Sequence, residues 1–461
     1  MSDLSDCIPA DELLRGHRCP RLVYLSYQRS LAQWHEPEET LSTLRQHRQQ
    51  WREQVWQEQG FVPSSQWRPH DRVIPGVLQA GGLCSDCDGL VWNGAWYEPV
   101  EIRTAKTIKL DYELRLGILA RILGELQGIA PGQGWVIRGD GRWQGVSLWR
   151  RQNQIQRLLE QWQTLRHAQA LPAVAMSKQR CYGCGWEQYC RQHGDPLSML
   201  PGLHQPHYQA LLSAGITSLE ALVHLNSEHL QGILACSESQ AQRILAQAQA
   251  CWQQQPLWIK PIQMPSAPLT LYFDVEAHAQ GVCVLGVLAV NRQQRSHFWG
   301  LWAKDPSHER SLWFRFLELV CRYPTAPIYH FSRFEVQTCQ RLSHTYGIPG
   351  YSLPQLLARF YDLETLIKGA VYFPIASYSL KNLAGWLGFQ WRPVELQGTP
   401  ALGNGLQAIS WYERWLETRD PQYIRALLIY NEDDCRATHH LHHWLVTQSI
   451  NQPAVGLLHH P

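Results

Sequence analysis

This chain of 461 residues lacks long apolar runs and an excess of charge of either sign. A helix that crosses a membrane needs about 18 consecutive apolar residues, and no segment of this chain is that long and apolar. The opening residues, MSDLSDCIPADELLRG, also lack the charged and then apolar pattern of an export signal. We therefore expect a cytoplasmic protein with no membrane association.

Acidic and basic residues almost cancel, with 41 Lys and Arg against 39 Asp and Glu and a net charge of +2. A protein that attracts nucleic acid with its whole surface carries a larger positive charge. Any contact with nucleic acid must therefore depend on local groups. The length predicts two or three domains.

The 13 cysteines are expected to be free or metal-bound, because a reducing compartment disfavours disulfides. Three of them lie close together in CYGCGWEQYC, and a fourth stands near the other end of the same region. These four are Cys19, Cys181, Cys184 and Cys190. Four thiolates suit either a tetrahedral Zn²⁺ ion or a [4Fe–4S] cluster. A zinc alternative pairs Cys84 and Cys87, in CSDC, with Cys181 and Cys184.

Hydrophobic patterning predicts an α/β protein of several domains. Residues 1–196 alternate short strands with helices, and residues 197–253 form short helices around Gly-containing turns, as in helix-hairpin-helix units. Residues 254–267 contain three prolines, a fourth follows at Pro268, and the segment is interpreted as a linker. Three strand-like runs open residues 268–449, and the alternation of helices and strands that follows favours a mixed sheet flanked by helices. Residues 450–461 form a tail.

Two carboxylates stand one residue apart in the strand-like run LYFDVEA. Side chains at positions i and i+2 of a strand share one face, so Asp274 and Glu276 should lie side by side. Two neighbouring carboxylates repel each other and resist burial. A divalent cation, or a partner Arg or Lys, is needed to offset that repulsion.

Further acidic residues follow at the junctions of predicted elements. Glu335 comes just after a strand and opens a helix, Asp362 lies at a similar junction, and Asp433 and Asp434 fall in a helical run. Tyr430 precedes Asp434 by one helical turn, so these two side chains share a helix face. Two Mg²⁺ or Mn²⁺ ions about 4 Å apart assist phosphodiester cleavage, and carboxylates from separate elements hold them.

The motifs FDVE, YHFSRFE, YDLETL, SYSLKNLAGWLGF and YNEDDC, in this order, resemble the RNase H-like, DEDD-type 3′–5′ exonucleases, in the branch fused to RecB-like nucleases. The resemblance covers residues 268–448 and implies an RNase H-like mixed-sheet domain. It implies that Tyr430 orients the attacking water and that four carboxylates hold the metals: Asp274, Glu276, Glu335 and Asp434. Asp433 competes with Asp434 for that role, and Lys381 is placed to meet a phosphate.

Residues 10–195 resemble the RecB-like and CRISPR-associated exonucleases of the PD-(D/E)xK class, which have a restriction-endonuclease-like α/β fold. The resemblance rests on the cysteine layout and on DCDGLVWNGAWYEPVEIRTAK. It implies that the four cysteines of the first set bind a [4Fe–4S] cluster that closes the domain. Cys84 and Cys87 then stand outside the cluster.

The same resemblance implies a second metal site, made by Asp88 and Glu101 with Glu53 as a third ligand. Asp88 and Glu101 flank an Asn-Gly turn and should be hairpin neighbours. The family has a lysine where this chain has Arg103, and an arginine cannot act as a base. Lys106 is the candidate replacement. The alternative is a domain that binds nucleic acid without cutting it.

The function that these features predict is a metal-dependent nuclease. We expect a 3′–5′ exonuclease that acts on single-stranded nucleic acid, DNA in preference to RNA, through residues 268–449. The other hypothesis is a non-catalytic protein, either a nucleic-acid-binding scaffold or a zinc-clamped binding module.

Overall fold

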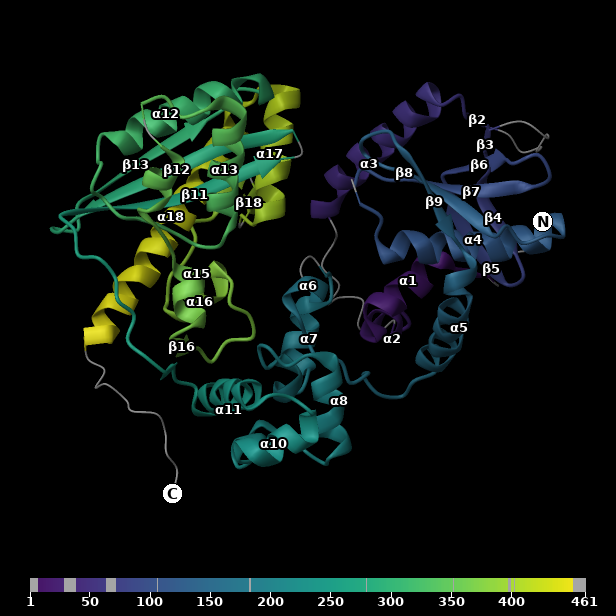
Figure 1. The fold of residues 1–461 in the computed structure, drawn as a ribbon, viewed down its shortest axis with the longest axis horizontal. Coiled ribbons are helices and arrows are strands. Elements are labelled where there is room, and N and C mark those ends of the chain that lie inside the picture. The colour runs from purple at the N-terminus through teal and green to yellow at the C-terminus, as the bar shows by residue number, and fades with distance from the viewer. Residues whose placement is uncertain are drawn as a thin grey trace. The chain divides into compact units, whose positions relative to one another are not determined.

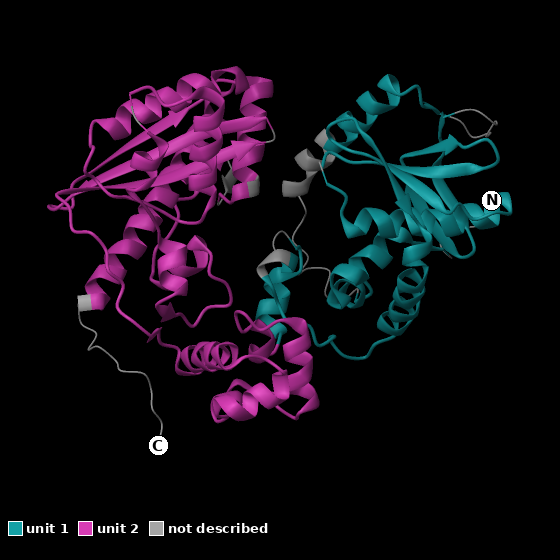
Figure 2. Cartoon of the chain, in the orientation of Figure 1, with its two compact units in different colours: residues 1–194 teal, residues 195–461 magenta. Residues whose placement is uncertain are grey.

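The computed structural model divides the chain into two compact units, residues 1–194 and residues 195–461 (Figures 1 and 2). The structure describes residues 7–28, 39–63, 72–105, 107–181, 184–278, 280–350, 352–396, 399–401 and 403–450. Both units mix helices and strands, so the predicted α/β multidomain class is confirmed. No helix in the described ranges is long and apolar enough to cross a membrane.

Unit 1 is built on a mixed sheet of six strands in the order β2-β3-β6-β7-β8-β9. These strands are β2 (Val62–Pro63), β3 (Arg72–Ile74), β6 (Gly89–Trp92), β7 (Tyr97–Ile102), β8 (Gln133–Ile137) and β9 (Trp143–Ser147). A second sheet contains β1 (Ile8–Pro9), β5 (Leu83–Cys87) and β4 (Gly76–Ala80). The helices are α1 (Ala10–Arg18), α2 (Pro20–Ser26), α3 (Glu39–Glu58), α4 (Leu110–Gln127), α5 (Gln152–Arg166), α6 (Lys178–Cys181) and α7 (Glu187–His193).

Strand β7 is the centre of unit 1, because every one of its residues is buried. It pairs antiparallel with β6 across the predicted turn, where Gly94 adopts a φ of 103° that a side chain would disfavour. It pairs in parallel with β8, and the apolar helix α4 makes the crossover between them. This hairpin and crossover place Asp88 and Glu101 next to each other, as the sequence predicts.

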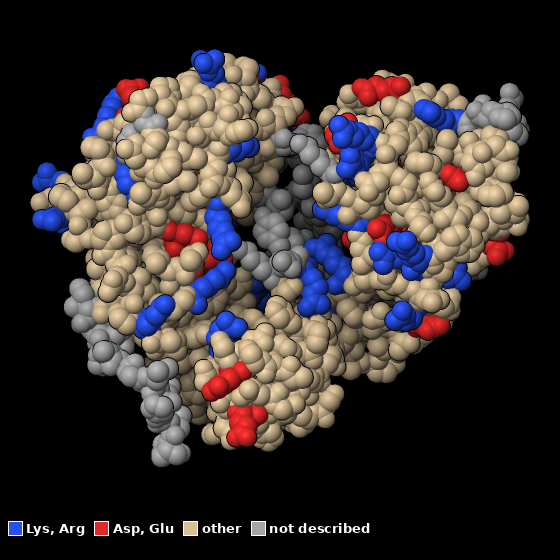
Figure 3. All heavy atoms as spheres, in the orientation of Figure 1, with Lys and Arg blue, Asp and Glu red and all other residues tan. Residues whose placement is uncertain are grey.

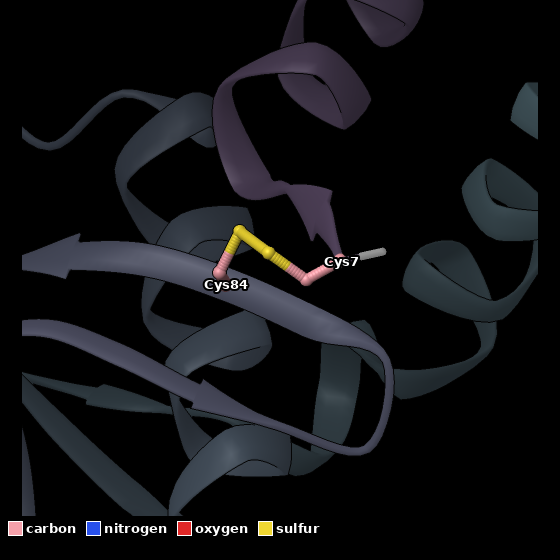
Figure 4. The surroundings of a disulfide bond; sticks show 2 residues. All are labelled: Cys7 and Cys84. Carbon is pink, nitrogen blue, oxygen red and sulfur yellow. A yellow bond between two sulfur atoms is a disulfide. The ribbon is translucent and has the colours of Figure 1, made fainter. Parts of the chain in front are cut away.

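A disulfide joins Cys7, just before β1, to Cys84 in β5 (Figure 4). It lies where β1 adds in parallel to β5, with Pro9 opposite Cys84. This bond corrects the expectation that the chain has no disulfides. It also ties Cys84 to Cys7, so Cys84 is not paired with Cys181 and Cys184 as the zinc alternative requires.

Unit 2 begins with a helical segment that contains α8 (Gln205–Ser213), α9 (Leu219–Val223), α10 (Ser227–Leu234) and α11 (Glu238–Gln253). Within the proline-rich stretch that follows, β10 (Leu257–Trp258) pairs antiparallel with β16 (Val371–Tyr372). Buried Gln247 of α11 donates to Phe373 O at 2.7 Å and accepts from Tyr378 Oη at 2.9 Å. These bonds attach the helical segment to the remainder of unit 2.

The main sheet of unit 2 has the strand order β13-β12-β11-β14-β15. The strands are β11 (Leu269–His278), β12 (Gly281–Asn291), β13 (Ser296–Trp302), β14 (Ile328–His330) and β15 (Phe360–Asp362), and β17 (Val394–Leu396) pairs separately with β18 (Thr399–Ala401). The helices are α12 (Glu309–Cys321), α13 (Phe334–Tyr346), α14 (Leu353–Leu357), α15 (Leu363–Lys368), α16 (Leu380–Trp386), α17 (Gly405–Thr418) and α18 (Pro421–Ile450). Short 3-10 turns also occur in both units.

The first three strands of this sheet form an antiparallel meander, and β14 and β15 extend it in parallel from β11. Successive side chains of β11 point to opposite faces of the sheet. Leu271, Phe273 and Val275 enter the core that holds α12, whereas Tyr272 faces the core that holds part of α18 (Figure 1). Asp274 and Glu276 continue the Tyr272 face, toward α18. The predicted mixed sheet flanked by helices is confirmed.

Gly286 of β12 allows α18 to approach the sheet closely. It pairs with Asp274 across β11 and β12, and a Cβ atom built on it would lie 1.7 Å from Asn431 Oδ1. Asn431 in turn donates to Asp274 Oδ2 at 2.7 Å. The missing side chain therefore makes room for the contact between α18 and Asp274.

We predict that Gly286→Ala lowers the free energy of unfolding by about 1–3 kcal/mol, because Asn431 must move to admit the methyl group. Gly385→Ala is the matched control, since no atom lies within 4 Å of a Cβ there. Urea unfolding measures the free energy of unfolding of both variants. If Gly286→Ala is as stable as Gly385→Ala, α18 moves to admit the methyl group at no cost in stability.

Candidate metal centre

Three carboxylates of unit 2 converge between β11 and α18. One oxygen each from Asp274, Glu276 and Asp434 lies within 4.8 Å of the other two. Glu276 and Asp434 are buried, and Asp274 is half-buried. The structure thus brings together the pair predicted from strand periodicity and the acidic residue predicted on the helix. Oxygen ligands of this kind suit a hard divalent cation.

Burial and mutual repulsion make these groups resist ionisation. Burial raises the pKa of Asp274 well above its usual range, and the charges of Asp434, Glu276 and Glu335 raise it further. The pKa of Glu276 is raised for the same reasons, and that of Asp434 is raised to about 6, chiefly by burial. A cation bound among the three would remove that repulsion, so the donor set fits a divalent metal.

Glu335 lies close enough to raise the pKa of Asp274 and Glu276, but it is not one of the three converging groups. It is buried in the first turn of α13, where Ser332 Oγ donates to its Oε2 at 3.1 Å. His330 Nδ1 stands 3.5 Å from the same oxygen. These contacts hold the Glu335 carboxylate at the edge of the acidic group.

The turn before Glu335 is strained and is fixed by Asp362. Ser332 has a φ of 107°, which costs a residue with a side chain about 1–3 kcal/mol. Its N–H donates to Asp362 Oδ1 at 3.1 Å, and Asp362 also caps α15. Asp362 therefore positions the turn that carries Glu335.

Tyr430 lies one turn before Asp434 on α18, and its hydroxyl hydrogen-bonds the Asp434 carboxylate. Burial and the nearby carboxylates raise the pKa of Tyr430 well above its usual value, which keeps the hydroxyl protonated. Its ring packs against Gly403, where a Cβ atom would lie 2.5 Å away. Lys381 Nζ sits 5.2 Å from the ring centroid and donates to Gly403 O.

Lys381 is a cationic side chain whose charge acts on Glu276 and Asp434. Burial lowers its pKa, and the charges of Asp434 and Glu276 oppose that shift. It is carried by α16, the helix predicted to pack beside the site. One ammonium cannot balance three or four carboxylates, so a net negative charge remains.

Two further side chains complete the centre and were not predicted from the sequence. Asn431 donates to Asp274, and Trp391 Nε1 donates to Asp434 Oδ1 at 2.7 Å. Asp433, the competitor for the ligand role, turns away instead, because its two oxygens accept from Arg392 Nε and N, each at 2.8 Å.

The acidic pair of unit 1 lies in a different environment. Asp88 Oδ1 accepts from Arg52 Nη1 at 2.9 Å, and Oδ2 accepts from Arg103 Nη1 at 2.6 Å and from Ile102 N at 2.8 Å. Burial raises the pKa of Asp88, but these positive and donor groups outweigh it and leave the pKa below its usual value. Asp88 is therefore fully engaged by protein groups.

Glu101 is also surrounded by guanidinium groups. It contacts Arg103 Nη2, and its Oε1 lies 3.5 Å from Arg115 Nε. Burial raises its pKa to about 7, against the lowering effect of Arg103. Arginines thus form ion pairs with both Asp88 and Glu101 and offset the charge that a divalent cation would otherwise balance.

Of the two remaining residues of the predicted unit 1 site, the structure describes only Glu53, which does not contact this pair. Glu53 is exposed on α3 and accepts from Gln49 at 2.6 Å, whereas its neighbour Arg52 is the α3 residue that reaches Asp88. Lys106 lies outside the described residues.

Four thiols gather at a small cavity of about 20 Å³ in unit 1. The cysteines that line it are Cys19, Cys181, Cys184 and Cys190. Burial raises the pKa of Cys184 to about 11, and the neighbouring thiols contribute. Arg21, which is buried, lines the same cavity and lowers the pKa of Cys190 against burial. The residues predicted from spacing alone are thus neighbours in space.

A comparison with protein families matches residues 271–446 to the RNase H superfamily. This match lies wholly within unit 2 and includes the acidic centre, so the predicted RNase H-like C-terminal domain is confirmed. No curated protein matches the chain.

We predict that Asp434→Asn stabilises the metal-free protein at neutral pH. A carboxyl group whose folded pKa is raised to about 6 favours the folded state at low pH, and that contribution is lost as pH rises through about 6. Asparagine does not ionise, so the variant should gain up to about 3 kcal/mol over the parent between about pH 4 and pH 7.

Urea unfolding of the parent and the variant at about pH 4 and about pH 7, with a chelator present, measures this gain in stability. Glu417→Gln, an exposed position on α17, is the control and should show no such difference. A gain that is the same at both pH values would contradict the raised pKa of Asp434.

Proposed function

We propose that unit 2 is a metal-dependent nuclease that hydrolyses phosphodiester bonds at the centre formed by Asp274, Glu276 and Asp434. The convergence of three acidic groups within 4.8 Å, in an RNase H-like domain, carries the proposal. Mg²⁺ or Mn²⁺ bound there would supply an activated water and would neutralise charge on the leaving oxygen. The three carboxylates, with Glu335 at their edge, would hold the metals.

The other side chains of the centre have separate tasks in this proposal. The Tyr430 hydroxyl, held by Asp434, orients the attacking water. Lys381 binds a non-bridging phosphate oxygen, because its ammonium group lies beside the acidic centre, 5.2 Å from the centroid of the Tyr430 ring. Asn431 and Trp391 fix Asp274 and Asp434 by their hydrogen bonds. We further propose 3′–5′ exonuclease polarity on single-stranded DNA.

For unit 1 we propose binding without cleavage. The hypothesis of a second active site at Asp88 and Glu101 is disfavoured by the arginines that hold both carboxylates. The non-catalytic alternative thus applies to unit 1 in this proposal, within a restriction-endonuclease-like fold of the RecB type. The gathered thiols are proposed to hold a [4Fe–4S] cluster, with Zn²⁺ as the alternative.

We predict that Asp274→Asn abolishes Mn²⁺-dependent degradation of a labelled single-stranded DNA, and that Tyr430→Phe lowers its rate roughly hundredfold. The first change removes a metal ligand, and the second removes only the hydroxyl that positions water. Gel analysis of products labelled at the 5′ end measures rate and polarity together.

Asp88→Asn is the matched control and should retain full activity. Activity that survives Asp274→Asn but is lost in Asp88→Asn would place the chemistry in unit 1 and refute the assignment to unit 2.

We predict that anaerobically purified protein carries about four irons per chain, absorbs near 400 nm and loses the iron in Cys190→Ser. Cys190 is buried beside the other three thiols, whereas Cys321 is exposed, so Cys321→Ser should keep the iron. Elemental analysis of the parent protein and both variants measures the iron and zinc bound per chain. One zinc per chain supports the alternative, and protein with neither metal contradicts both.

A further inference from the structure

A groove of about 320 Å³ lies between the helical segment and the RNase H-like domain within unit 2. On one side are Gly202, His204 and His207, which precede or begin α8, and Arg243 of α11. On the other are Lys368, at the end of α15, and Tyr372 of β16. The size falls within the about 300–1,000 Å³ typical of ligand sites.

The charge of this groove is positive only. None of its lining residues is acidic. Arg243 is exposed and forms no ion pair among the described residues, and it lies close enough to Tyr372 to oppose the rise in pKa that burial gives that hydroxyl. Lys368 is exposed and pairs with Glu364 at 2.7 Å, which leaves its remaining N–H donors for a ligand.

A histidine nitrogen in the groove has no partner. His207 Nδ1 is buried and makes no hydrogen bond within the described part of the chain. Such a group is costly unless a ligand or water satisfies it. Arg243 and Lys368 are the two exposed cationic groups of the groove that can contact an anion.

A second cavity, of about 500 Å³, shares Lys368 with the groove. Its charged lining is mixed, because Arg333 and Lys368 stand beside Asp362 and Glu364. Arg333 is exposed and stands two residues before Glu335. Phe334, between them, is 45% exposed, which is unusual for a phenylalanine beside a buried acidic group. Figure 3 shows Lys and Arg side chains over the region of α15 and α16, with Asp and Glu side chains among them.

We infer that this path, from Arg243 through Lys368 to Arg333, binds the sugar-phosphate backbone of the single strand whose end reaches the metal centre. The inference rests on the proposed function of that centre. Positive groups at intervals match a phosphate backbone, and Tyr372 and Phe334 offer faces on which bases stack. The helical segment thus serves as a clamp that keeps the strand on the enzyme.

An acidic peptide is the competing ligand for a positive groove, and the aromatic residues argue against it. A carboxylate-rich peptide has no flat rings to stack on Tyr372 or Phe334. Because the net charge of the chain is only +2, a strand needs such a local path in order to bind.

Binding tests the path without requiring cleavage. The full chain carrying Asp274→Asn is titrated into a fluorescent single-stranded DNA of about 20 nucleotides, a length that spans a site of this kind. Adding Arg243→Glu and Lys368→Glu together should weaken binding at least tenfold. The slope of affinity against salt should also fall by about 1–2, because two phosphate contacts are lost.

Arg292→Glu is the matched control, an exposed arginine in the turn between β12 and β13 that lines neither cavity, and it should leave the affinity unchanged. Equal affinities for the groove variant and this control overturn the inference. So does a poly-glutamate peptide that competes as well as unlabelled DNA, since the groove would then be a site for acidic peptides.

Activity separates this inference from the proposed function. With an intact centre, Arg243→Glu should raise KM for the long strand and leave cleavage of a trinucleotide unchanged, because the short substrate does not reach the groove. Parent protein that binds DNA through the groove but cuts nothing with Mg²⁺ or Mn²⁺ refutes the proposed function and supports the path. If the parent protein cuts both substrates and Arg243→Glu changes neither rate, the inferred path is refuted and the proposed function stands.

Discussion

The repulsion among buried carboxylates is the constraint on which unit 2 depends. Asp274, Glu276 and Asp434 are brought within 4.8 Å of one another, with Lys381 as a single nearby ammonium group. A fold that leaves such charge unbalanced loses stability unless a cation enters. The close approach at Gly286, the bond from Asn431 and the strained turn before Glu335 all serve to hold this arrangement. In the proposed function, the repulsion that destabilises the metal-free centre is what favours the binding of a divalent ion.

Unit 1 meets the same electrostatic problem with a different solution. Asp88 and Glu101 are as buried as the carboxylates of unit 2, but Arg52, Arg103 and Arg115 lie against them. An arginine is permanently charged and binds carboxylates with a planar fork, so it replaces the cation and fixes the pair. Two units with acidic pairs on central strands thus differ in what balances the charge: arginines do so in unit 1, and we propose that a divalent metal does so in unit 2.

The sequence predicted the local part of each site well and the long-range part poorly. Strand periodicity placed Asp274 beside Glu276, and helix periodicity placed Tyr430 beside Asp434, because both depend only on neighbours along the chain. Trp391, Arg52 and Arg115 reach the sites from distant segments, and no local pattern marks them. The Cys7–Cys84 bond was missed for the same reason, since the parallel pairing of β1 with β5 brings those residues together.

The central claim is that the acidic centre of unit 2 binds a divalent metal and the acidic pair of unit 1 does not. Titration of the metal-free protein with Mn²⁺, followed by the electron paramagnetic resonance signal of the free ion, tests it most directly. The account predicts that the parent protein and Glu101→Gln bind Mn²⁺ equally, whereas Glu276→Gln loses the tight binding. Tight binding that survives Glu276→Gln and disappears in Glu101→Gln would contradict it.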